Sequence, residues 1–203
     1  MHYVLSNPEA ILRLGLEHLT VAFGAVLIAL LVGLPLGVAA AKLRWLELPA
    51  LTVAGLLYLV PSLALFAFLI PLLGLGVRTA IVGLSIYSLL VIMRNVAIGV
   101  ASVPAPILEA GRGIGMTRRQ LFGLVELPLA LPLIVAGLRI AAVMTIGIAS
   151  LAAYIGAGGF GTLIFRGIAT ADNDLILAGT LPTAALALAC DQLLRLLERT
   201  VRS

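Results

Sequence analysis

Charged residues, cysteine and histidine are all scarce in this 203-residue sequence. Acidic and basic residues together make up 11% of it and hydrophobic residues 62%, whereas a soluble domain carries roughly 25% charged residues. With a mean hydropathy of +1.21, the sequence argues against a water-soluble globule. The single cysteine, Cys190, excludes an internal disulfide, and the two histidines, His2 and His18, lack metal-ligand spacing.

The features of nucleotide enzymes and nucleic-acid binders are missing as well. The sole lysine, Lys42, is not part of a GxxxxGK pattern, so a phosphate-binding loop is absent. The net charge is +4, but the arginines are scattered between apolar blocks and predict no nucleic-acid partner. A membrane-embedded enzyme is an alternative from another class. It would need a Ser/His/Asp set, an acid pair or a metal cluster at membrane depth, and no such set is found.

Long uncharged runs are what the sequence has instead. Residues 19–41 carry no charge, and about 20 apolar residues cross a hydrocarbon core of about 30 Å as a helix. The start signals in residues 6–9 predict a short helix at the membrane interface before this span. A cleavable signal peptide is the weaker alternative, because the run is too long and no strongly basic segment precedes it.

The whole chain, residues 1–203, predicts a single all-α membrane domain, a polytopic bundle of about five transmembrane helices. We place the spans at about residues 19–41, 48–73, 77–97, 129–154 and 175–195. The second run contains Pro61 and Pro71, so we expect a kinked or tilted helix with an outer turn. Arg139 interrupts the fourth run, where it lines a pathway, pairs with a carbonyl or snorkels to the inner interface.

Basic residues decide the orientation, since five spans put the two ends of the chain on opposite sides. Lysine and arginine favour the cytoplasmic side, and nine against three favour an outside N-terminus and a cytoplasmic C-terminus in the inner membrane. The nine are Lys42, Arg44, Arg94, Arg112, Arg118, Arg119, Arg195, Arg199 and Arg202, against Arg13, Arg78 and Arg166. Near the C-terminus, Asp191 with Arg195 and Glu198 with Arg202 are spaced as helical ion pairs.

The inside loop between the third and fourth spans, about residues 101–128, is longer than a connector needs. Residues 107–113 predict a short helix and Gly115 a sharp bend. Thr117, with Gln120 three residues later, predicts a capping box that begins a second helix. Pro128 marks the next boundary.

Glu109 is a rare acid in this basic loop. It either pairs with Arg112, or with Arg118 or Arg119 across the bend, or is only solvated.

This loop resembles the EAA loop of ABC-importer permeases. The family pattern is EAA, three residues, Gly, nine residues, a hydrophobic residue, any residue, then Leu-Pro. The positions that match are Glu109, Ala110, Gly115, Val125, Leu127 and Pro128. Gly111 replaces the second alanine and loosens the first helix. The resemblance implies that a cytoplasmic ATPase docks on this segment, with Met116, Thr117 and Arg118 also contributing, whereas the bland alternative is an interfacial hairpin with no partner.

The resemblance extends over nearly the whole chain. The stretches RNVAIGV, EAGRGIGMTRRQL, VELPLALPLIVAGLR, LAAYIGAGGFGTLIFRGIAT and LILAGTLPTAALALACDQLL are similar to the permease subunit of osmoprotectant ABC importers, which carry glycine betaine, carnitine or choline. This implies a type I, MetI-like fold and alternating access. A methionine-type ABC permease, which shares the five spans and the EAA pattern, is the alternative.

The same resemblance implies the partners. They are a cytoplasmic ABC ATPase dimer that binds ATP and Mg, a second permease copy or paralogue, an external substrate-binding protein and membrane lipid. This chain itself would bind no cofactor and would not be an enzyme.

The segment GAGGFG, residues 156–161, matches the GxGxxG spacing of dinucleotide-binding proteins. It follows a membrane span and is succeeded by acidic residues in a loop, about residues 155–173, rather than by a βαβ unit, so we reject a nucleotide site. By the charge count it lies outside, where it is either an outer gate element or a plain turn. The gate or pathway candidates are Gly156, Gly158, Gly159, Phe160, Gly161, Tyr154 and Arg139, with Phe160 and Phe165 supplying hydrophobic closure.

Aromatic rings elsewhere are candidates for contact with a quaternary ammonium, although most would be packing residues. They are Tyr58, Tyr87, Tyr154, Phe66 and Phe68.

Overall fold

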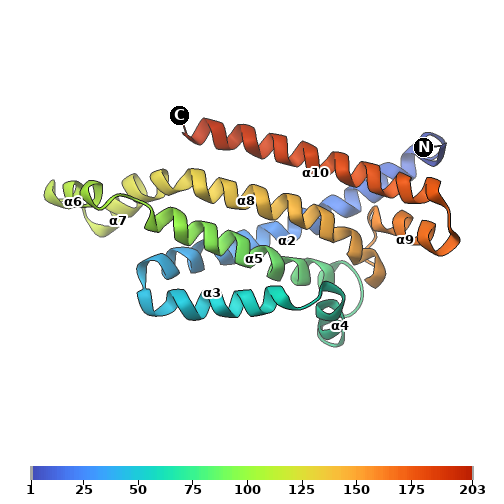
Figure 1. The fold of residues 1–203 in the computed structure, drawn as a ribbon, viewed down its shortest axis with the longest axis horizontal. Helices are drawn as coiled ribbons and strands as arrows, with labels where there is room; N and C mark the ends of the chain where they lie inside the picture. Colours follow the sequence, from blue (N-terminus) through green and yellow to red (C-terminus); the bar gives the residue numbers. More distant parts are fainter. Residues whose placement is uncertain (1, 203) are drawn as a thin grey trace.

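The computed structural model describes residues 2–202 as a bundle of helices, and no strand occurs among these residues. Figure 1 shows the long helices running side by side. The elements are α1 (His2–Ser6), α2 (Pro8–Lys42), α3 (Arg44–Leu59), α4 (Ser62–Leu73), α5 (Val77–Ala101), α6 (Ala105–Gly113), α7 (Arg118–Leu121), a π-helical stretch (Phe122–Glu126), α8 (Leu127–Ala149), a 3-10 stretch (Ser150–Ile155), α9 (Gly161–Thr170) and α10 (Asn173–Arg202). The expected all-α membrane fold is confirmed.

Helix α2 begins earlier than the sequence patterns suggested. Pro8 occupies its first turn with Glu9, and Lys42 lies in its last turn, where each charge complements the helix dipole. The helix then continues without a break for 35 residues. The prediction of a separate interfacial helix before the first span was therefore wrong, because nothing between the start signals and the apolar run interrupts the helical hydrogen bonds.

The second apolar run is not one kinked helix but two. α3 and α4 meet at a bend of 98°, and Val60 and Pro61 between them are extended, since a residue before proline disfavours the helical conformation. Pro71 lies inside α4 without ending it. Four helical segments of the described chain are long and apolar enough to cross a membrane, or five if this bent pair counts as one span.

The core lies between α2, α5 and α8, with α10 against α8. One cluster of buried residues joins Ala25 of α2, Leu84 of α5 and Ile146 of α8. A second, nearer the other end of the bundle, joins Ala29, Ile92 and Ile134 of the same three helices. Side chains such as Leu48, Phe68 and Leu72 are more than 70% exposed on the outer faces, as expected of surfaces that hydrocarbon covers.

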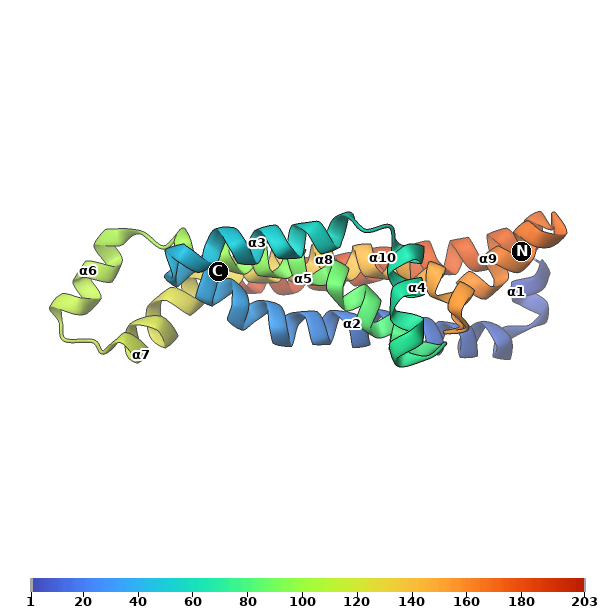
Figure 2. The same ribbon diagram turned by 90° about the horizontal axis from the view of Figure 1, so that it is seen from below.

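Two short helical assemblies occupy opposite ends of the bundle. α6 and α7 form a hairpin that projects beyond it, and Figure 2 shows this hairpin in profile. The other end carries α4, α9 and the N-terminus, whereas the C-terminus lies toward the hairpin end. The long helices thus hold the two candidate sites far apart.

Candidate functional site

The projecting hairpin is built as its sequence predicted. Thr117 and Gln120 form the capping box: the Gln120 N–H donates to the threonine hydroxyl at 3.3 Å and the Thr117 N–H to the glutamine oxygen at 2.9 Å. Gly115 makes the bend with φ of +85°, a left-handed conformation that side chains disfavour. The two predicted features that orient α7 relative to α6 are therefore present.

Gly111, the departure from the family pattern, is the point where α6 packs on α7. It is buried, and a Cβ there would lie 2.6 Å from Leu121 and 3.3 Å from the sulfur of Met116. That this glycine also loosens the first helix stays a prediction. The absent side chain permits close packing between the two short helices.

The tip of the hairpin presents apolar and acidic side chains to its surroundings. Ile114 is 78% exposed and Ile107 42%, and Glu109 and Ala110 are also exposed. Among the described residues, Glu109 makes no ion pair, so neither local arginine pairing is present. Apolar side chains on a polar projection mark a surface suited to contact with another protein.

The helix that leaves the hairpin runs straight into the bundle. α7 continues through the π-helical stretch, which contains the half-buried Val125, into α8 with Leu127 and Pro128 in its first turn. The predicted boundary at Pro128 coincides with the start of α8 at Leu127, where proline is tolerated in the first turn, although the span itself continues through the π-helical stretch. The resulting helix extends from Arg118 to Ile155.

One ion pair ties this continuous helix to the end of α2. Glu126 is 3% exposed and accepts a hydrogen bond from Lys42, whose ammonium also lies 5.7 Å from the centre of the Phe122 ring. Sequence reasoning missed this pair. The signal was available, because Lys42 ends an uncharged run and Glu126 is the one acid inside the closing part of the loop motif.

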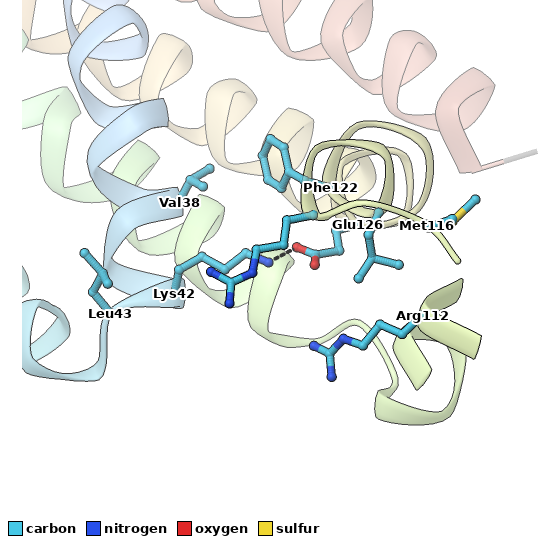
Figure 3. Close-up of a pocket in the computed structure, with 9 residues that line it drawn as sticks. Val38, Lys42, Leu43, Arg112, Met116, Phe122 and Glu126 are labelled. Atoms are coloured by element: carbon cyan, nitrogen blue, oxygen red, sulfur yellow. Dashed lines mark hydrogen bonds and ion pairs between the residues drawn. The ribbon is translucent and has the colours of Figure 1, made fainter. Parts of the chain in front are cut away.

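The ion pair forms part of the wall of a cavity of about 870 Å³ between α2 and the hairpin. In Figure 3 the Lys42 side chain points at Glu126, and Arg112 extends from α6 toward the same space. The lining residues are Val38, Lys42, Leu43, Arg112, Met116, Arg118, Leu121, Phe122 and Glu126.

Arg139, the charge inside the fourth span, is held by acids rather than by a carbonyl. Its guanidinium donates to Asp191 at 2.8 Å and to Glu198 at 3.2 Å, both on α10. Asp191 also accepts from Arg195 at 3.0 Å, the pair expected from the spacing. The expected pairing of Glu198 with Arg202 involves a side chain outside the described ones. Arg139 therefore joins α8 to α10.

The outer glycine segment packs against the first turns of α2. Gly158 and Gly159 have φ of +76° and +79°, and the Gly159 N–H donates to the Glu17 carboxylate at 3.0 Å. A Cβ on Gly158 would lie 2.2 Å from that carboxylate. Sequence reasoning missed Glu17, for which only its isolation as an acid before an uncharged run gave a signal.

Behind this contact, Gly159, Phe160 and Gly161 are buried in protein. Phe160 is 5% exposed and its ring lies 5.5 Å from that of His18, whose Nε2 is 2.8 Å from the Ile146 carbonyl. Gly161 is buried too, since a Cβ there would overlap the Ser150 carbonyl. Gly156 ends the 3-10 stretch in a left-handed conformation.

The chain between the glycine segment and α10 is largely helical. Where a loop over about residues 155–173 was expected, α9 occupies most of it.

The remaining aromatic candidates do not converge on one point. Tyr154 is 64% exposed and meets Phe165 edge-on at 4.2 Å, and Tyr58 meets Tyr87 at 5.7 Å. The other two differ: Phe66 is wholly buried and Phe68 74% exposed. Within residues 2–202 no three His, Cys, Asp or Glu side chains are placed to share a metal ion.

Comparison with known proteins gives a consistent set of relatives. Residues 33–203 match the family model described as binding-protein-dependent transport system inner membrane component. The osmoprotectant import permease protein OsmW of Salmonella typhimurium is 43% identical, covering 98% of this chain and 94% of its own length. The choline transport system permease protein OpuBB of Bacillus subtilis is 40% identical with the same coverage. The glycine betaine/carnitine/choline permease protein OpuCD of Bacillus subtilis is 41% identical and covers 98% and 87%.

A solved structure has the same fold. A chain of the MetNI methionine ABC transporter, in an inward-facing conformation, superimposes with a TM-score of 0.82 over 94% of this chain and 96% of its own. The superposition shows a shared fold, and because the sequences are only 24% identical it indicates nothing about the substrate.

Proposed function

Since this chain belongs to the family of binding-protein-dependent transport system inner membrane components, we propose that it is the permease subunit of an ATP-driven importer. Its substrate would be a quaternary-ammonium compatible solute: glycine betaine, choline or carnitine. Near-full-length identity of about 40% to permeases named for these solutes carries the proposal. The methionine alternative is weaker, because it has only a fold likeness behind it.

The coupling role belongs to the hairpin of α6 and α7. A partner ATPase dimer, which would hold ATP and Mg, docks on the exposed tip around Glu109, Ala110 and Ile114. Thr117 and Gly115 fix the angle of the hairpin, and the unbroken helix behind α7 carries its displacement into the bundle. Movement of the tip therefore becomes movement of α8.

The outer role belongs to the glycine segment. Gly158, Gly159 and Phe160 pack against Glu17 and His18, so α2 holds the outer gate closed in this conformation. Irregular backbone at membrane depth is tolerated where protein buries it, as here. Release of the Gly159–Glu17 hydrogen bond is then one step of opening.

The orientation and the remaining partners complete the proposal. The N-terminus and the glycine segment face outside, and the hairpin and the C-terminus face the cytoplasm of this inner-membrane protein, as the charge distribution favours. An external binding protein delivers the solute, and a second permease copy or paralogue completes the pathway.

Uptake of labelled solutes tests the function. Vesicles containing this permease with its ATPase and binding protein should accumulate glycine betaine, choline or carnitine when ATP is supplied, and not methionine. The permease alone should neither hydrolyse ATP nor turn over a solute. ATP-driven methionine uptake with no uptake of the three ammonium solutes would contradict the proposed substrate class.

A further inference from the structure

The cavity between α2 and the hairpin carries more positive charge than its own acid can neutralise. Lys42, Arg112 and Arg118 line it, against Glu126 as the single acid. Glu126 is already paired with Lys42. No described acidic side chain forms an ion pair with Arg112 or Arg118, so two guanidinium groups from two different short helices remain available to an anion.

The rest of the cavity wall is apolar. Val38, Leu43, Met116, Leu121 and Phe122 supply it. A small hydrated anion gains nothing from such a wall. An amphiphile gains on both sides, because its charged group meets the arginines while its apolar part covers the aliphatic and aromatic side chains.

The chain next to the cavity exposes apolar side chains of the kind that contact lipid. Leu43, Trp45 and Leu48, which lead from the cavity into α3, are 43%, 73% and 76% exposed. Tryptophan is enriched at the level of the lipid headgroups. We therefore expect a bilayer surface to meet the end of α2 beside this cavity, which would bring a headgroup within reach of it.

We propose that this cavity binds the phosphate group of an anionic phospholipid, with Arg112 and Arg118 as its ligands and the apolar wall against the glycerol and upper acyl region. Guanidinium groups suit phosphate because they donate parallel hydrogen bonds. The bound lipid bridges the end of α2 to both helices of the hairpin. It thereby holds the hairpin at a fixed height above the membrane, whichever solute the protein carries.

Trp45 provides an internal reporter, because it is the only tryptophan of the chain. We would place the complete permease in phosphatidylcholine nanodiscs and titrate lipid with brominated acyl chains, as phosphatidylglycerol or as phosphatidylcholine. Quenching of Trp45 fluorescence measures the preference for the anionic lipid. The wild-type protein should prefer phosphatidylglycerol, and Arg112→Gln and Arg118→Gln should each weaken that preference about tenfold, as expected when hydrogen bonds to a charged phosphate are lost.

Arg119→Gln is the matched control. It removes the same charge from the position beside Arg118, but Arg119 does not line the cavity, so the preference should persist. Equal quenching by both lipids would overturn the proposal, and so would a loss in Arg119→Gln as large as in Arg118→Gln, which would indicate general surface charge.

Two further arms separate the lipid from other anions. Inorganic phosphate added at constant ionic strength should leave the preference unchanged; if phosphate abolishes it, the site takes free phosphate instead. Purified ATPase should likewise leave it unchanged. If ATPase removes the preference, the arginines serve an acidic surface of that partner and the lipid site is refuted.

Discussion

Replacing Lys42 by methionine should destabilise the junction between α2 and the hairpin. The substitution keeps a flexible chain of similar length against Phe122 but removes the ammonium that pairs with Glu126. The two partners differ sharply in exposure, 43% for the lysine side chain and 4% for the glutamate side chain. Removing the ammonium therefore leaves a buried carboxylate without its partner, and this accounts for the expected loss of stability.

The magnitude follows from that asymmetry. Removing one partner of a buried ion pair costs about 3–5 kcal/mol, and we expect about 3 kcal/mol for Lys42→Met because the cavity admits water beside the pair. Glu126→Leu should cost only about 1 kcal/mol, since the exposed lysine can turn to solvent. The double variant should lie within about 1 kcal/mol of wild type, because apolar residues replace a buried pair at little cost.

Unfolding in mixed micelles of increasing SDS fraction measures these free energies, with Trp45 fluorescence reporting on the same end of α2. The four proteins form a double-mutant cycle whose coupling free energy should be about 4 kcal/mol in magnitude. Lys42→Arg is the control that keeps the charge. A coupling near zero, or a double variant as unstable as Lys42→Met, would refute the claim that this ion pair fastens the hairpin to α2.

Three other predictions concern the two ends of the molecule. Gly115→Val should weaken co-purification of the ATPase, because a φ of +85° strains a branched side chain, whereas Gly113→Val, whose Cβ would meet open space, should retain it. Gly158→Val should lower solute uptake with ATPase retention intact, because its Cβ would lie 2.2 Å from a carboxylate oxygen of α2; unchanged uptake would leave the segment a plain turn. In a cysteine-free background, cysteine at Asp172 should react with an impermeant thiol reagent in intact cells and cysteine at Thr117 should not; labelling at Thr117 would reverse the orientation.

The sequence predicted those features of the fold that are formed by residues close together in the chain. The capping box at Thr117 and the bend at Gly115 depend on the backbone preferences of a few neighbouring residues, which the sequence shows directly. Helix boundaries were harder. Asn7 and Pro8 start a helix, but nothing in their chemistry shows whether that helix ends before the membrane. A proline such as Pro128 is compatible both with the first turn of a new helix and with a helix that ends there, so it does not distinguish the two.

The contacts between helices could not be predicted in the same way. Arg139 was noticed as a charge inside a span, but its partners lie 52 and 59 residues away on α10. Glu17 meets the glycine segment across 142 residues. Such pairs depend on how the helices are rotated against one another. A single sequence shows where the charged residues are, but not which distant residue each of them contacts.

The unbroken course of α2 gives the molecule a mechanical property. Glu17 near one end touches the outer glycine segment, and Lys42 at the other end touches the root of the hairpin. At 1.5 Å per residue these two positions are about 38 Å apart along one rod. If such a rod tilts about its middle, its ends swing in opposite directions. A displacement of Lys42 would then be felt with reversed sense at Glu17, and Pro35, which removes one helical hydrogen bond between them, is the point where the rod would bend first.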